Sequence, residues 1–265
     1  MIPVILTVAG SDPSGGAGIQ ADIKTISALG GYAASVITAI TAQNTLGVQA
    51  VFPLKTEEFS TQLYSVLNDL RPQAIKLGML PHADCIDNLT QILTTLIHKS
   101  FIVCDPVMIS TSGRRLMDAD AVEKLQDKLF PLCTLITPNL QEASFLCQNE
   151  ISHIDEMKKQ AFLLAHRYNT SVLIKGGHLK GNRMCDILYD LHTSQSHIFE
   201  SPKIHTHNLH GTGCTLSSAI ATYLAGGKDL VQAVELSKHY MIQAIEHGKK
   251  LKIGQGNGPL WHFFE

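Results

Sequence analysis

Short apolar runs alternate with longer amphipathic segments along the whole chain. The runs are bounded by turn residues and have the length of buried strands, whereas the segments show the three-to-four-residue spacing of helices. This alternation is typical of βαβ units and predicts an α/β protein with a mostly parallel sheet. The strands are expected at residues 4–9, 35–40, 49–53, 74–77, 101–104, 134–136, 172–174, 186–191 and 197–202. The helices are expected at residues 17–29, 57–70, 84–98, 118–130, 140–146, 154–168, 214–224 and 230–247.

The alternation continues from end to end without a linker rich in Gly, Pro or Ser, which predicts a single domain over residues 1–265. With 45% hydrophobic and 17% charged residues, the composition is that of a soluble globular protein. A formal charge of -2 provides no basic field for a polyanion, so nucleic acid is not an expected partner. The first apolar run stops at Gly10, too soon for a spanning helix, so the chain is expected to be cytoplasmic with no membrane partner.

The strongest local signal is the loop of residues 210–215, which leads directly into a small, apolar helical stretch. Gly211 and Gly213 allow a tight turn whose N–H groups point one way, and the helix adds its positive end, so the loop suits a phosphoryl group. A cysteine at this position, Cys214, is expected to have a pKa lowered to roughly 3.5–7.5. The alternative is a glycine turn in which Thr212 or Thr215 caps the helix.

A second glycine-rich loop, residues 10–18, follows the first strand. It matches neither the dinucleotide fingerprint nor the P-loop pattern, because Gly16 and Ala17 stand where the P-loop has Lys and Ser/Thr. Such a loop implies close backbone approach to a ligand or to a neighbouring element. Asp22, one turn into the next helix, is also explained as a favourable charge near the helix start.

Other polar residues follow the predicted strands, at the edge where open α/β sheets bind their ligands. Asp105 can hold a magnesium ion or simply start an Asp-Pro turn. Asn139 and Glu142 have the spacing of a capping box, and alternatively contact phosphate and a metal-bound water. Lys175 ends a strand beside two glycines, where nucleotide phosphates would lie, although a solvated rim lysine is the commoner case. Lys238 is by pattern a surface lysine of an amphipathic helix.

Three stretches together resemble the hydroxymethylpyrimidine/phosphomethylpyrimidine kinases of thiamine biosynthesis, members of the ribokinase-like superfamily. The stretches are residues 8–22 (VAGSDPSGGAGIQAD), 175–178 (KGGH) and 210–217 (HGTGCTLS). The resemblance runs from about residue 5 to the tail at 254–259 and implies a ribokinase-like three-layer sandwich with helices on both faces of the sheet. It also implies a homodimer.

The activity implied by the resemblance is ATP-dependent phosphorylation of 4-amino-5-hydroxymethyl-2-methylpyrimidine and then of its monophosphate. In family terms Gln43 pairs with the pyrimidine edge, a task that suits an amide because the ring offers a donor beside an acceptor. Gly10 and Asp22 would close around the ring, and Met79 and Val107 would pack its faces. Further residues are expected at the nucleotide (Asn139, Lys175, Thr212 and Lys238) and at Mg²⁺ (Asp105 and Glu142).

Cys214 stands where many ribokinase-like sugar kinases carry an aspartate base. Phosphoryl transfer has a loose transition state that asks little of its base. Lys175, a magnesium ion and the N–H groups from Gly211 to Cys214, including that of Gly213, are therefore expected to supply most of the rate. Cys214 is expected to orient the hydroxyl and to accept its proton late.

Three other functions remain open at this point. A pyridoxal kinase uses the same architecture on a ring of similar size, and dual activity is an alternative, although Gln43 and residues 10–16 favour the aminopyrimidine. A binding protein without catalysis is disfavoured by the presence of Lys175, Asp105, Glu142 and Cys214 together. A dinucleotide oxidoreductase lacks its fingerprint.

Overall fold

The computed structural model describes residues 2–96, 99–108, 116–177 and 183–264. In this part of the chain nine strands form one sheet in the order β3-β2-β1-β4-β5-β6-β7-β8-β9. The strands from β2 to β7 in this order are parallel, and β3, β8 and β9 join antiparallel at the edges. The mostly parallel sheet is confirmed. The bounds are β1 Val4–Ser11, β2 Tyr32–Asn44, β3 Gly47–Pro53, β4 Ala74–Leu77, β5 Phe101–Cys104, β6 Leu135–Ile136, β7 Ser171–Ile174, β8 Arg183–Asp190 and β9 Gln195–Pro202.

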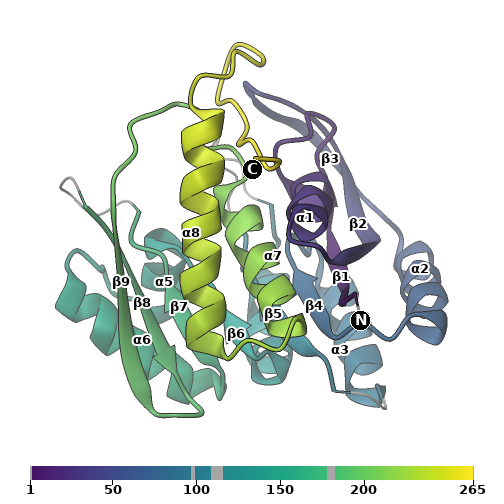
Figure 1. Cartoon of the computed structure of the whole chain (residues 1–265). Helices are drawn as coiled ribbons and strands as arrows, with labels where there is room; N and C mark the ends of the chain where they lie inside the picture. The colour runs from purple at the N-terminus through teal and green to yellow at the C-terminus, as the bar shows by residue number, and fades with distance from the viewer. Residues whose placement is uncertain (1, 97–98, 109–115, 178–182, 265) are drawn as a thin grey trace.

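Helices cover both faces of this sheet, which confirms the three-layer prediction (Figure 1). One face carries α1 (Gly18–Ala28), α7 (Thr212–Ala225) and α8 (Leu230–Gly248). The other carries α2 (Thr56–Asp69), α3 (Ala83–Thr95), α4 (Ala119–Lys124), α5 (Leu140–Cys147) and α6 (Ile154–Tyr168). Side chains alternate across a strand, so neighbouring residues of one strand enter the cores on opposite faces. In β1, Ile5 packs in the core beneath α1, α7 and α8, and Leu6 packs in the core on the α2–α6 face. The last two residues of the helix predicted at 84–98 lie outside the described residues.

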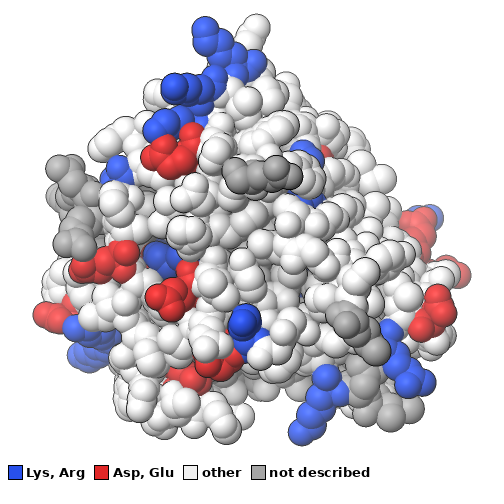
Figure 2. Space-filling view, viewed as in Figure 1, with Lys and Arg blue, Asp and Glu red and all other residues white. Residues whose placement is uncertain are grey.

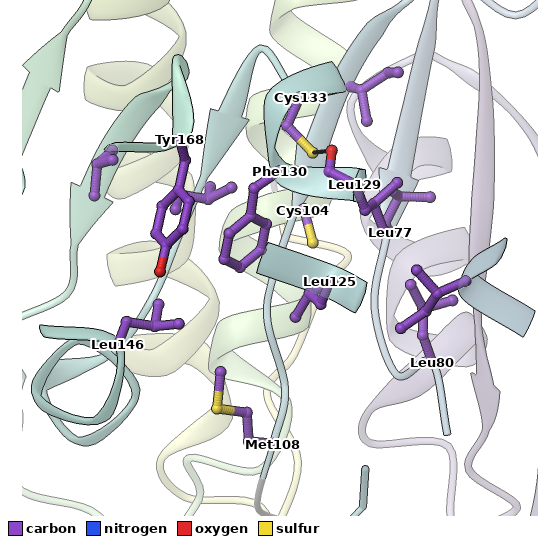
Figure 3. Close-up of a cluster of buried hydrophobic side chains, with 14 of the residues drawn as sticks. Leu77, Leu80, Cys104, Met108, Leu125, Leu129, Phe130, Cys133, Leu146 and Tyr168 are labelled. Carbon is purple, nitrogen blue, oxygen red and sulfur yellow. Dashed lines mark hydrogen bonds between the residues drawn. The ribbon is translucent and has the colours of Figure 1, made fainter. Parts of the chain in front are cut away.

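Aromatic and aliphatic side chains fill the core on the α2–α6 face (Figure 3). The rings of Phe130 and Tyr168 meet edge to face with centroids 5.0 Å apart, and the Cys133 thiol donates a hydrogen bond to the Leu129 carbonyl. A fully buried side chain of this size contributes about 1.5–3 kcal/mol. This packing supports β5 and β6, and the polar residues that follow these two strands stand on a rigid base.

The helix predicted at residues 118–130 has a different form in the structure. After α4 the chain widens into a π-helical turn, Leu125–Leu129, and then tightens into a 3₁₀ turn, Phe130–Leu132. Pro131 explains the end of the helix, because proline has no N–H to donate and its ring collides with the preceding turn. The wider turn allows Leu125, Leu129 and Phe130 all to be buried.

Strand β2 is longer than the 35–40 predicted, because its polar end pairs with β3. The register joins Thr41 to Val51 and Asn44 to Gly47, with an irregularity between Ala42 and Gln43. Polar residues at 41–44 look like a loop in the sequence, but hairpin pairing satisfies their backbone groups. Gln43 is consequently held at the tip of a hairpin.

Charged side chains of both signs are scattered over the face drawn in Figure 2, and basic ones gather where α8 ends. Lys249, Lys250 and Lys252 follow α8 directly in the sequence. Within the described ranges, none of the helices is both long and apolar enough to cross a membrane.

The chain after α8 folds back and buries His262 against α7. His262 Nε2 lies 3.0 Å from Thr215 Oγ1, and the Tyr240 hydroxyl donates to the His262 carbonyl. Burial, aided by the charge of Lys24, lowers the pKa of His262 to about 4. The imidazole is therefore neutral in the folded protein at neutral pH.

This histidine predicts a loss of stability in acid. Between pH 6.5 and about 4 the unfolded chain binds a proton at His262 that the folded chain does not, so stability falls as pH falls, by about 2–3 kcal/mol for this group. Urea unfolding of the parent and of His262→Gln, which keeps a polar partner for Thr215, at pH 7 and pH 4.5 measures the effect. The free energy of unfolding of His262→Gln, relative to that of the parent, should be higher at pH 4.5 than at pH 7. An unchanged difference would contradict the assignment.

Candidate active site

The site is built around the start of α7. Gly211 is the N-cap residue with φ +88°, and a Cβ there would lie 1.8 Å from the Gly16 carbonyl oxygen, so a side chain has no room. The N-cap residue is this glycine, which makes no side-chain cap, and Thr215 pairs with His262 instead, so the capping alternative for Thr212 and Thr215 is wrong. The Thr212 N–H donates to the Leu209 carbonyl, and the N–H groups of Gly213 and Cys214 lie at a helix end without a side-chain cap, the usual environment for an anion.

The first glycine loop is organised by the buried carboxylate of Asp12. It accepts hydrogen bonds from the Ser14 hydroxyl and from the N–H groups of Ser14, Gly16 and Ala17. It also lies 2.8 Å from His210 Nε2 on the second loop. Burial would raise the pKa of Asp12, but the hydrogen bonds from His210 and Ser14 hold it below its ordinary value. The two glycine loops are therefore in direct contact, joined by an ionised carboxylate.

Asp105 and Lys175 form an ion pair beneath the first turn of α7. Lys175 Nζ lies 2.6 Å from Asp105 Oδ1, which also accepts from the Thr137 hydroxyl. A Cβ on Gly213 would stand 3.0 Å from Asp105 Oδ2 and 3.4 Å from Lys175 Nζ. Burial alone would lower the pKa of Lys175, but the charges of Asp105 and Glu142 raise it. A fixed positive charge thus stands beside the helix end.

The predicted capping box at the start of α5 is confirmed. Asn139 accepts from the Glu142 N–H, and the Glu142 carboxylate accepts from the Asn139 N–H. Burial raises the pKa of Glu142 to about 7, opposed by the charge of Lys175 and reinforced by that of Asp105. A carboxylate kept partly protonated by its surroundings gains from a nearby cation.

These carboxylates fit magnesium better than a transition metal. Across the described residues no three His, Cys, Asp or Glu side chains come together as a metal site. Magnesium needs no such cage, because it binds through one or two carboxylates together with waters and substrate phosphates. Asp105 and Glu142, coupled through their charges beside the α7 start, have the required chemistry.

The residues predicted to hold the substrate lie at the ends of neighbouring strands. Met79 packs so closely on Gly10 that a Cβ on this glycine would be 2.3 Å from the Met79 methyl group. Val107 is partly buried two residues after Asp105, and its N–H donates to the Asp105 carbonyl. The Gln43 amide reaches the His210 ring across the hairpin tip.

Comparison with known proteins now identifies the family. A family model described as phosphomethylpyrimidine kinase matches residues 12–261. The chain belongs to the phosphomethylpyrimidine kinase family. It is 46% identical to a hydroxymethylpyrimidine/phosphomethylpyrimidine kinase of Rhizobium meliloti over 99% of this chain and 98% of that one.

Solved structures agree with the family and show the ribokinase-like fold. A phosphomethylpyrimidine kinase from Clostridium difficile is 42% identical, with a TM-score of 0.80 over 92% of this chain and 100% of that one. The ADP complex of a Bacillus subtilis pyridoxal kinase is 35% identical, with a TM-score of 0.89 over 99% and 98%. The chain is accordingly a phosphotransferase.

Cys214 of this kinase does not have the lowered pKa predicted from its place at a helix start. Burial, reinforced by the negative charges of Asp22 and Asp105, raises its pKa to about 11. Lys76 and a hydrogen bond from the Gly18 N–H act in the opposite direction but do not prevail. Desolvation outweighs the helix end, and Cys214 is a thiol at neutral pH.

Asp22 does not reach the surface where a ring could bind. Its side chain is 0% exposed and accepts hydrogen bonds from Thr7, from Ser218 on α7 and from the equally buried Lys76. The predicted direct contact with substrate is therefore replaced by a supporting role. Lys76 was missed, although a lone lysine within an apolar strand, Ala74–Leu77, was a visible signal.

Lys238 is also buried, against the prediction of a surface lysine at the nucleotide. It is 5% exposed and its Nζ lies 2.5 Å from Asp186 Oδ2. Asp186 Oδ1 in turn accepts from the Gly176 N–H, next to Lys175. The lysine points inward because α8 packs on the sheet, and its contact with the strand neighbouring Lys175 runs through Asp186. His178, the last residue of the 175–178 stretch, lies outside the described residues.

The buried pair of Lys76 and Asp22 predicts a strong coupling in stability. Lys76→Met leaves an uncompensated carboxylate at 0% exposure and is expected to cost about 3–5 kcal/mol. Adding Asp22→Asn removes that charge and should recover part of the loss. Guanidinium unfolding of the two single variants and the double variant measures the coupling, and losses that simply add would contradict it.

Proposed function

We propose that this kinase uses ATP to phosphorylate the hydroxymethyl group of 4-amino-5-hydroxymethyl-2-methylpyrimidine, and then phosphorylates the monophosphate to the diphosphate, in one domain spanning residues 1–265. The observation that carries this proposal is the convergence at the α7 start of an uncapped helix end, the Asp105–Lys175 pair and Glu142. The pyrimidine kinases of R. meliloti and C. difficile support the substrate, and the ADP complex of the B. subtilis enzyme supports the nucleotide.

The phosphoryl site is assigned from charge. The N–H groups of Gly211, Gly213 and Cys214 stabilise the transferring group, since the Thr212 N–H donates to the Leu209 carbonyl, and Lys175 neutralises charge on its oxygens. Asp105 and Glu142 would hold a magnesium ion, which when bound offsets the charge of the nucleotide phosphates. Asn139 and Thr212 flank the same edge, and Lys238 supports it through Asp186 and the Gly176 N–H.

The pyrimidine site is assigned to the other side of the α7 start. Gln43 pairs with the ring edge, and Met79, Val107 and Gly10 enclose the ring. Cys214 orients the hydroxyl group. Because the transition state is loose, the hydroxyl keeps its proton until late. The Cys214 thiol must first release its own proton to solvent; the charge of Lys76 favours the resulting thiolate, which then accepts the hydroxyl proton and becomes a thiol again.

Activity assays with two substrates separate this proposal from its nearest alternative. The B. subtilis relative, a pyridoxal kinase, has the higher TM-score of the two structures, so pyridoxal is the second candidate. ADP release with Mg-ATP is expected to be faster with the hydroxymethylpyrimidine than with pyridoxal. Chromatography of the products should show the monophosphate followed by the diphosphate. Faster turnover of pyridoxal would overturn the choice of substrate.

The role of Cys214 predicts both a rate loss and a pH dependence. Cys214→Ala removes the proton acceptor and is expected to lower kcat about 100-fold, the lower range for general base catalysis. In the parent the thiolate fraction grows as pH rises toward about 11, so kcat should rise above neutrality. Cys214→Asp places a carboxyl there, whose ordinary pKa lies far below that of a thiol, and should move the rise in kcat to lower pH. Full activity of Cys214→Ala would refute the role.

A homodimer stays a prediction from the family resemblance. Ile40 and Phe52, which face each other across β2 and β3, are 50% and 58% exposed, and such an apolar pair favours a contact between chains.

A further inference from the structure

The amide of Gln43 lies between two groups whose hydrogen-bonding roles are fixed elsewhere. On one side Thr41 Oγ1 lies 3.2 Å from Gln43 Oε1 and 2.8 Å from the Ser11 carbonyl oxygen. A carbonyl oxygen can only accept, and a hydroxyl has a single hydrogen, so Thr41 donates to Ser11. The Thr41 oxygen then has only lone pairs for Gln43. The amide atom that faces Thr41 must be a donor.

On the other side His210 Nε2 lies 3.2 Å from Gln43 Nε2 and 2.8 Å from Asp12 Oδ2. The Asp12 carboxylate accepts four further hydrogen bonds within its loop, from Ser14, Gly16 and Ala17, and its pKa is held low. An ionised carboxylate can only accept, so His210 Nε2 carries the hydrogen. The amide atom that faces His210 must be an acceptor.

Both sides therefore demand the same orientation. We infer that the Gln43 amide is turned by 180°, with Oε1 toward His210 and Nε2 toward Thr41, and that these two residues are positioning residues that fix its donor–acceptor polarity. The half-turn exchanges the oxygen and nitrogen positions. It replaces an acceptor–acceptor contact at Thr41 and a donor–donor contact at His210 with hydrogen bonds, the second of which shares the His210 hydrogen with Asp12. Atom positions alone do not decide between the two orientations. The two contacts are independent, since one runs through Ser11 and the other through Asp12.

The fixed amide sets the chemistry of the ligand edge. One N–H on the Thr41 side and one lone pair on the His210 side remain free for a ligand. A matching ring edge has an acceptor beside a donor, as in a 4-aminopyrimidine with its ring nitrogen N3 and amino group. A 4-oxopyrimidine, with N3–H beside a carbonyl, has the reverse polarity and meets donor with donor. This inference rests on the proposed function and adds the basis of its selectivity.

The test compares two substrates that differ only at this edge, 5-hydroxymethyl-2-methylpyrimidine with a 4-amino or a 4-oxo group. Steady-state kcat/KM with Mg-ATP is measured for both with the parent, Thr41→Val, Thr41→Ser and His210→Leu. The parent should prefer the amino compound strongly. Thr41→Val and His210→Leu each release one side of the amide and should narrow that preference about tenfold or more. Thr41→Ser keeps the hydroxyl and should retain the preference.

Thr222→Val is the matched control, because it removes a buried hydroxyl from α7 that donates to the Ser218 carbonyl and does not touch the amide. Its preference should equal that of the parent. If Thr41→Val and His210→Leu slow both substrates equally, the two residues are merely structural and the inference is wrong. If His210→Leu does not fold, the comparison of Thr41→Val with Thr41→Ser still tests the inference. A parent that phosphorylates neither compound contradicts the proposed function, whereas one that accepts both equally or favours the oxo compound contradicts only the inferred polarity.

Discussion

The contact between the two glycine loops is the constraint on which the site depends. The Gly16 carbonyl occupies the space that a side chain on Gly211 would need, and the Asp12 carboxylate spans the remaining gap to His210. Because His210 is also held by the backbone of Gly258, the start of α7, the first loop and the tail are fixed against one another. The helix end proposed to bind the phosphoryl group is therefore positioned by backbone packing and one buried carboxylate, which costs little conformational entropy at the moment of binding.

Three lysines in the interior or at its edge each have a carboxylate partner. Lys76–Asp22 joins β4 to α1, Lys175–Asp105 joins the ends of β7 and β5, and Lys238–Asp186 joins α8 to β8. Such pairs add little net stability over apolar packing, since desolvation offsets most of the attraction. Their value here is positional: each fixes a polar group at the carboxyl edge of the sheet. Glu142 lacks an equally close cation, and its raised pKa shows that an added positive charge beside it would be favourable.

Local patterns predicted most of the fold because strand and helix periodicity is a short-range property. The strand at 74–77 and the helix at 154–168 agree with the structure to the residue. The end of β2 was missed because three of the residues at 41–44 are polar, and only pairing with β3 makes them a strand. The charged site residues were harder, because Lys238 and its partner Asp186 are 52 positions apart and their burial follows from how α8 packs on the sheet. Asp22 was interpreted as a favourable charge near the start of a helix for the same reason, because its partner Lys76 is distant in the sequence.

One carboxylate, Asp12, connects the local backbone to the recognition of the ring edge. It shapes its own loop by accepting N–H groups, and by the same charge it fixes the hydrogen on His210 Nε2, which determines which end of the Gln43 amide is the acceptor. A neutral side chain in its place could not fix the hydrogen on His210 so firmly, because it could itself act as a donor or leave the imidazole free to change tautomer. The loop sequence and the selectivity of the site are thus two consequences of a single buried negative charge, and a change at residue 12 would alter both together.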